Sequence, residues 1–151
     1  MIEIKLCGLK EPSHIEAAFS LGIKYLGFVF FEKSPRFLRN DSAKSLISLT
    51  PPGIIKVGLV VNPSDECLNS ISGLNLDMIQ LHGSESINRV KEIKSKFNFS
   101  LIKAIGIKEK KDLDLVERYS EVADHLLIDA KPSSNTSLPG GNGIKFDWTI
   151  L

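Results

Sequence analysis

Short apolar runs rich in β-branched residues recur along the chain and predict buried strands. They lie at residues 2–6, 25–30, 54–61, 76–81, 100–105 and 125–128. Most runs are apolar at nearly every position, which is typical of parallel strands that are buried on both faces. Their starts recur at intervals of about 25 residues, the length of one strand and one crossover helix. The pattern therefore predicts alternating strands and helices.

The stretches between the runs have helical periodicity. Ile15, Ala18 and Phe19 form one apolar stripe, and a second contains Ile87, Val90, Ile93, Lys94 and Phe97. Start and stop signals agree with these helices. Gly22 is placed to end the first helix in a left-handed conformation. Among the candidate caps, Asn62 precedes Pro63, Asn40 or Asp41 would cap the second helix, and Ser84 would cap the fourth.

Two architectures fit six such units: an open doubly wound sheet and a TIM (β/α)8-type barrel. Polar residues follow almost every predicted strand. They are Cys7, the loop 34–36, Asn62, the segment 80–83 and Asp129. A barrel gathers nearly every strand end around one mouth, so this distribution favours the barrel. We expect residues 1–151 to form one partial (β/α) barrel domain, with about six of the eight units.

Amino-acid composition and charge argue against several classes of partner and site. The 151 residues carry a net charge of +1, with both signs interspersed, which argues against nucleic acid and anionic membranes as partners. The apolar start of the chain is interrupted by Glu3 and Lys5, unlike a signal peptide, so the predicted compartment is the cytoplasm. Cys7 and Cys67 are far apart and have no metal-ligand spacing, so neither a disulfide framework nor a zinc site is indicated.

Several strand ends carry motifs of one known family. They are KLCGL at 5–9, GFVFFEKSPRFL at 27–38, VGLVVN at 57–62, LDMIQLHGSE at 76–85, LLIDAK at 126–131 and LPGGNGIKFDW at 138–148. Each motif is weak alone, but six in the same order and spacing are specific. The sequence resembles the phosphoribosylanthranilate isomerases from its first residue to its last.

The resemblance implies a barrel closed by a seventh and an eighth unit, whereas this chain stops at Leu151, just inside the sixth helix. In that family the last two units supply most of the phosphate site, as in many barrels. We therefore expect the isolated chain to have negligible activity and to associate through its open edges. A second copy or a complementing chain would be the partner that covers them.

The implied reaction is an Amadori rearrangement of a phosphoribosyl aminoaldose into an aminoketose, a step of tryptophan biosynthesis. It needs one acid and one base and neither a metal nor a redox cofactor. The resemblance makes Cys7 the general base and Asp129 the general acid. The apolar run before Asp129 predicts a partly desolvated carboxyl with a raised pKa. The alternatives are a small packed cysteine and a loop or capping aspartate.

Other residues are candidates for binding the small phosphosugar. Arg36 could clasp the anthranilate carboxylate, although a solvated arginine is the alternative. Gln80 and His82 could contact the substrate, or His82 could satisfy a backbone carbonyl. Gly140 and Gly141 could bring backbone N–H groups close to an anion, although flexible loops also contain such runs.

Three rival hypotheses remain open. The chain could be a catalytically inactive fragment or part of a split barrel that needs a partner chain. It could be another barrel enzyme that acts on a phosphosugar, although the motifs match the isomerase. It could also be an open-sheet binding or signalling domain, which would need an acidic cluster near the first strand, and KLCGL has none.

Overall fold

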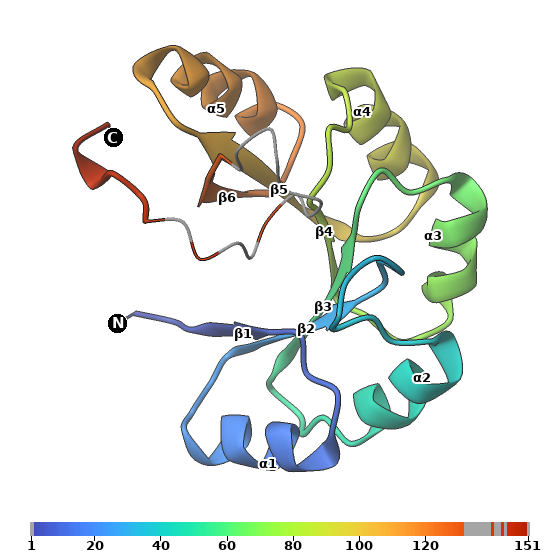
Figure 1. Cartoon of the computed structure of the whole chain (residues 1–151). Helices are drawn as coiled ribbons and strands as arrows, with labels where there is room; N and C mark the ends of the chain where they lie inside the picture. Colours follow the sequence, from blue (N-terminus) through green and yellow to red (C-terminus); the bar gives the residue numbers. More distant parts are fainter. Residues whose placement is uncertain (1, 132–139, 141–142, 144, 151) are drawn as a thin grey trace.

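A curved, fully parallel sheet organises the chain (Figure 1). The computed structural model describes residues 2–131, 140, 143 and 145–150. The strands are β1 (Lys5–Cys7), β2 (Tyr25–Val29), β3 (Ile55–Val60), β4 (Met78–Leu81), β5 (Ser100–Ile107) and β6 (His125–Ala130). Each pairs with its sequence neighbours, in the order β1 to β6. The result is part of a TIM-type barrel, as predicted, rather than a doubly wound sheet.

Five α-helices lie along the outer side of this curved sheet (Figure 1). They are α1 (Pro12–Ser20), α2 (Asn40–Ser48), α3 (Asp65–Ser72), α4 (Ile87–Lys96) and α5 (Leu113–Ser120). Two short 3-10 helices, η1 (Lys110–Asp112) and η2 (Trp148–Ile150), complete the described elements. Leu151, the position predicted to lie inside a sixth helix, is outside the described residues.

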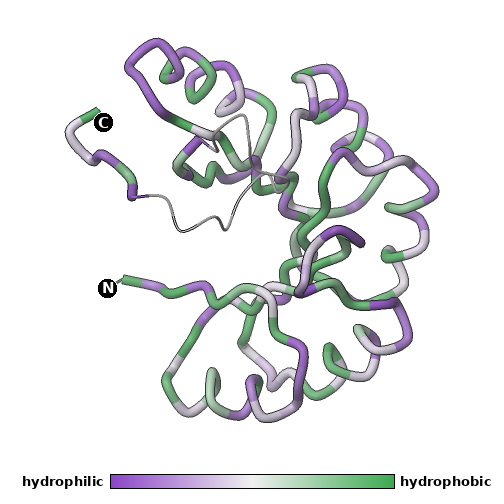
Figure 2. The backbone as a smooth tube through the Cα atoms, in the orientation of Figure 1, coloured by the Kyte–Doolittle hydropathy of each residue, from purple (hydrophilic) through white to green (hydrophobic). Residues whose placement is uncertain are grey.

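The core has two parts. The larger cluster joins the helices to the sheet and includes fully buried side chains such as Phe28, Leu68 and Ile93. The smaller cluster, Val57, Met78 and Ile102, involves strand residues alone. In Figure 2 the hydrophobic colour follows the strands, while the helices alternate with polar residues. The predicted stripe on α4 is confirmed at Val90 and Ile93, but Phe19 on α1 is 56% exposed.

Gly22 has a φ of +68° just after α1, as predicted for a left-handed helix end. The predicted helix caps are wrong. Ser64 caps α3 and Ser86 caps α4, each through a hydrogen bond to a backbone N–H, and α2 follows Arg39 without a side-chain cap. Asn62 instead accepts a hydrogen bond from the backbone N–H of Ser84, at 2.8 Å, so both residues serve a contact between two loops.

The two outer strands of the sheet are β1 and β6. Ile2, Ile4 and Leu6 in and before β1 are 91%, 54% and 44% exposed, so this edge presents apolar side chains together with backbone groups that no other described strand pairs. None of the helices that the structure describes has the length and apolar character needed to cross a bilayer.

Candidate active site

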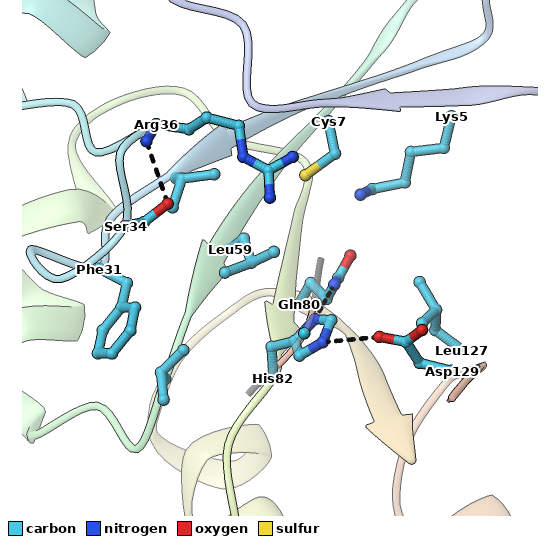
Figure 3. Close-up of a pocket in the computed structure, with 13 residues that line it drawn as sticks. Lys5, Cys7, Phe31, Ser34, Arg36, Leu59, Gln80, His82, Leu127 and Asp129 are labelled. Carbon is cyan, nitrogen blue, oxygen red and sulfur yellow. Dashed lines mark hydrogen bonds and ion pairs between the residues drawn. The ribbon is translucent and has the colours of Figure 1, made fainter. Parts of the chain in front are cut away.

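A cavity of about 320 Å³ opens at the carboxyl ends of the strands (Figure 3). Five strands, together with the residues that directly follow them, each contribute two residues to the cavity lining, and the two are two positions apart in the sequence. These pairs are Lys5 and Cys7, Val29 and Phe31, Leu59 and Val61, Gln80 and His82, and Leu127 and Asp129. Since alternate residues of a strand point to the same face, each pair places both side chains in the cavity. Ser34, Arg36 and Gly140 complete the lining.

Cys7 ends β1 on one side of the cavity, and the side chain of Arg36 lies beside it (Figure 3). The intervening Gly8 explains how Arg36 comes so close. Gly8 has a φ of +89°, and a Cβ there would overlap Cδ of Arg36. The loop is held by the backbone N–H of Arg36, which donates to Oγ of Ser34 at 3.1 Å. Among the described residues, nothing hydrogen-bonds to the Arg36 guanidinium.

Three polar side chains from β4 and β6 form a chain of contacts on the other side of the cavity (Figure 3). Nε2 of Gln80 lies 2.6 Å from Nδ1 of His82. Nε2 of His82 lies 3.4 Å from Oδ2 of Asp129. Gln80 is 1% exposed, and its buried Oε1 has no hydrogen-bond partner among the described residues. The structure thus brings three predicted site residues together.

The pKa of the Asp129 carboxyl is lowered, which corrects the expectation of a raised value. The hydrogen bond with His82 is the largest cause, and the backbone N–H of Ala130 also donates to Oδ1, at 2.8 Å. Burial acts in the opposite direction but is outweighed. Asp129 is therefore a stronger acid than an ordinary aspartic acid, and it carries its proton for less of the time at neutral pH.

Gly140 lies against His82 and Asp129. A Cβ at this position would overlap Nε2 of His82 and come within 2.9 Å of Oδ2 of Asp129, so any other residue there would displace these two side chains. Gly141, the other glycine predicted to bind substrate, lies outside the described residues. No cluster of three or more His, Cys, Asp or Glu side chains in the described part of the chain is suited to a metal ion.

A buried ion pair anchors the loop that follows His82. Nζ of Lys103 lies 2.9 Å from Oε2 of Glu85, and the two side chains are 3% and 1% exposed. The same ammonium donates to the carbonyl oxygens of Gly83 and Ala104. Oε1 of Glu85 accepts from the backbone N–H groups of Asn62 and Gly83. This pair, the Glu85–Lys103 anchor, therefore joins the ends of β3 and β4 to β5.

A second ion pair holds the chain just beyond Asp129. Nζ of Lys131 lies 2.8 Å from Oδ1 of Asp112, which is buried. The pKa of the Asp112 carboxyl is lowered to about 2, first by Lys131 and then by the backbone N–H of Lys108. The pair ties the end of β6 to η1, and so restrains the strand that carries Asp129.

We expect Asp112→Asn to lower the free energy of unfolding by about 2 kcal/mol at pH 7. A carboxyl whose pKa is lower in the folded protein stabilises the folded state at pH values above its ordinary pKa, 3.8. This contribution disappears as the pH falls to about 2. Denaturant titrations from pH 7 to pH 2 should show the difference between the two proteins shrinking below about pH 4. Asp114→Asn on the exposed face of α5 is the control, and an equally large effect there would contradict this prediction.

Comparisons with known proteins agree with this geometry. The family model described as N-(5'phosphoribosyl)anthranilate (PRA) isomerase matches residues 4–151. The chain belongs to this isomerase family. A curated N-(5'-phosphoribosyl)anthranilate isomerase of Ruegeria sp. (strain TM1040) is 48% identical over 151 residues, which is 99% of this chain and 70% of that protein. Its counterpart in Paracoccus denitrificans is 46% identical with the same coverage.

Solved structures of the isomerase family share the fold. The phosphoribosyl anthranilate isomerase of Thermotoga maritima has a TM-score of 0.85 and 30% identity, over 99% of this chain and 70% of that one. Another has a TM-score of 0.79 and 30% identity, over 86% of this chain and 66% of that one. It is in complex with reduced 1-(o-carboxyphenylamino)-1-deoxyribulose 5-phosphate. A third, with a TM-score of 0.77 and 28% identity over 89% and 68% of the two chains, concerns monomers generated from the dimeric enzyme of Thermotoga maritima.

The isomerase motifs predicted Cys7 and Asp129, which lie on the two sides of the cavity. They did not predict three other residues that shape the site. Lys5 lines the cavity two positions before Cys7, and strand alternation could have revealed it. Glu85 lies inside the LHGSE motif, and Lys103 interrupts an apolar strand. A charged residue within a buried run needs a buried partner, so Lys103 itself signalled an ion pair.

Proposed function

We propose that this chain provides the general acid and the general base of an N-(5'-phosphoribosyl)anthranilate isomerase. The reaction converts the N-linked aminoaldose into 1-(2-carboxyphenylamino)-1-deoxyribulose 5-phosphate, in tryptophan biosynthesis. The observation that carries the proposal is a cavity with a thiol on one side and a carboxyl on the other. A sugar between them would meet a base at one carbon and an acid at its ring oxygen. The cytoplasm stays the predicted compartment.

Asp129 acts as the general acid in this proposal. Its proton passes to the ring oxygen as the bond between that oxygen and the first sugar carbon breaks. The bond electrons stay on the oxygen, and the nitrogen lone pair forms a C=N bond. Cys7, as thiolate, then takes the proton from the second carbon; the electron pair released forms the C1=C2 bond of the enolamine, and the C=N electrons return to nitrogen. The enolamine becomes the aminoketose when its C2 hydroxyl loses a proton and C1 gains one. The two groups come from β1 and β6, on opposite sides of the cavity.

Arg36, Gln80 and His82 surround the same space. The guanidinium of Arg36 has the fork geometry that binds a carboxylate through two hydrogen bonds, so we assign it the anthranilate carboxylate. The buried Oε1 of Gln80 lacks a hydrogen-bond partner within the described part of the chain, and Figure 3 shows it on the side of Gln80 that faces the cavity. A buried acceptor without a donor is unfavourable, so a sugar hydroxyl is a suitable donor for it. Gly140 brings the backbone close to the acid.

Arg36→Ala should raise KM about tenfold or more while lowering kcat less, because the carboxylate is remote from both proton transfers. Steady-state kinetics on N-(5'-phosphoribosyl)anthranilate would measure both constants. Arg39→Ala, at the start of α2 and outside the cavity lining, is the matched control and should behave like the wild type. An unchanged KM in Arg36→Ala would remove Arg36 from the substrate site.

The direct test of the proposed function measures turnover by this chain extended with a seventh and an eighth β/α unit of the family. Purified protein is incubated with N-(5'-phosphoribosyl)anthranilate, and the aminoketose is separated by chromatography. Formation of the product above the spontaneous rate supports the proposal. Binding without turnover would support the inactive-fragment alternative instead. The 151-residue chain measured beside it would test the expectation that its own activity is negligible.

A further inference from the structure

His82 is placed to act on Asp129 rather than on the substrate alone. Its Nε2 faces the carboxyl oxygen Oδ2 at 3.4 Å, and its side chain is only 13% exposed. Nδ1, the other ring nitrogen, lies 2.6 Å from Nε2 of Gln80. Both polar atoms of the ring are therefore engaged by protein groups, and neither is turned toward open solvent.

The contact with Gln80 decides which ring nitrogen carries the hydrogen. The Nε2 group of an amide only donates hydrogen bonds, so in this orientation of the Gln80 amide Nδ1 of His82 accepts. A neutral imidazole that accepts at Nδ1 carries its hydrogen on Nε2, the atom that lies 3.4 Å from Oδ2 of Asp129. Gln80 is suited to this task because it is 1% exposed, and its place in β4 two residues before His82 puts both side chains on the same face.

This arrangement matters when Asp129 gives up its proton. Carboxylate charge then develops on the oxygen atoms, and a hydrogen bond to an ionised acceptor is about twice as strong as one between neutral groups. The bond from His82 therefore strengthens during the transfer and stabilises its product more than its starting state. An ether-like ring oxygen is weakly basic, so it needs a donor made more acidic in this way.

We infer that Gln80 and His82 are positioning residues for the acid, with Gln80 fixing His82 as the tautomer whose Nε2–H stabilises the carboxylate that Asp129 becomes. The inference rests on the proposed function and deepens it. The direction of the Asp129 pKa agrees, since the His82 hydrogen bond is its largest cause. Among the described residues, the other ionisable groups that line the cavity are Lys5 and Cys7 from β1 and Arg36 from the loop after β2, and the Glu85–Lys103 anchor holds the loop that follows His82.

Two substitutions of His82 separate this role from simple packing. Methionine fills similar space without an N–H, whereas glutamine keeps an N–H donor near the position of Nε2. In His82→Met, kcat should fall about tenfold or more while KM stays within about twofold of the wild type. Loss of the hydrogen bond raises the pKa of Asp129, so the alkaline limb of the kcat profile should move to higher pH. His82→Gln should restore part of kcat and keep the limb near that of the wild type.

Other kinetic outcomes would overturn the inference. Wild-type kcat in His82→Met would do so, because Asp129 would then need no partner. A rise in KM with unchanged kcat would make His82 a substrate ligand instead. Equal loss in both variants, with no movement of the alkaline limb, would indicate only a packing role. Circular dichroism would verify that each variant is folded.

A second measurement needs no substrate, so it separates failure of the inference from failure of the proposed function. The ¹⁵N chemical shifts of His82 report which ring nitrogen carries hydrogen, with His14 and His125, both outside the cavity, as internal references. We expect hydrogen on Nε2 in the wild type, and a shift toward a mixture of tautomers in Gln80→Met. A wild-type ring with hydrogen on Nδ1 alone, or shifts unchanged in Gln80→Met, would overturn the inference even if the isomerase activity were demonstrated.

Discussion

In this chain extended by a seventh and an eighth β/α unit of the family, replacing Cys7 by alanine or Asp129 by asparagine is expected to lower kcat about a hundredfold or more, as for loss of a positioned base or acid. Alanine removes the thiolate that, in the proposed mechanism, takes the proton from the second sugar carbon. Asparagine keeps the shape of Asp129 and can still contact His82, but it has no acidic proton to give. Steady-state kinetics on N-(5'-phosphoribosyl)anthranilate would measure the loss in each variant.

Matched controls are available in the same chain. Cys67→Ala removes a half-buried thiol of α3 that packs against the core away from the cavity. Asp41→Asn neutralises a carboxylate in the first turn of α2. Both should retain nearly wild-type kcat. Near-normal turnover in Cys7→Ala or Asp129→Asn would exclude that residue from the proton transfers.

Lys103→Met should lower the free energy of unfolding by about 3–5 kcal/mol, as expected when one partner of a buried ion pair is removed. Methionine retains most of the side-chain volume, but Glu85 is left as a buried carboxylate without its cation. The carbonyl oxygens of Gly83 and Ala104 also lose a donor. Urea denaturation followed by circular dichroism would measure the change.

Two comparisons isolate the cause. Lys94→Met breaks the ion pair with Asp124, in which the side chains are 45% and 34% exposed, and should cost less than about 1 kcal/mol. Lys103→Met combined with Glu85→Gln removes the uncompensated charge and should recover part of the lost stability. A loss in Lys103→Met no larger than in Lys94→Met would show that the anchor contributes little to folding.

The strands were predictable because a parallel strand covered on both faces is apolar at nearly every position. The run at 25–30, for example, became β2 (Tyr25–Val29). The helix caps were not predictable. Asn62 and Ser84 have the composition of caps, but they contact each other across two loops, and this tertiary contact overrides their local preference.

In the site, likewise, the local sequence predicted the positions of the residues but not the effects of neighbours that are distant in sequence. The positions of Cys7, Gln80, His82 and Asp129 around one cavity followed from motifs at the ends of strands. The electrostatics of Asp129 did not follow, because its sequence neighbours are apolar and suggest only desolvation. The group that outweighs desolvation, His82, comes from a different strand and becomes a neighbour only in the folded sheet.

The strand order has a consequence for how the protein folds. Because every strand pairs with its neighbour in sequence, the sheet can be extended one β/α unit at a time, and each step closes a connection of similar length. Cys7 and Asp129, however, belong to the first and last strands of this series. The four intervening strands set the position of one relative to the other. We therefore expect the proposed acid–base pair to form only after all six strands have paired, and loosening of any strand between them to separate the two groups.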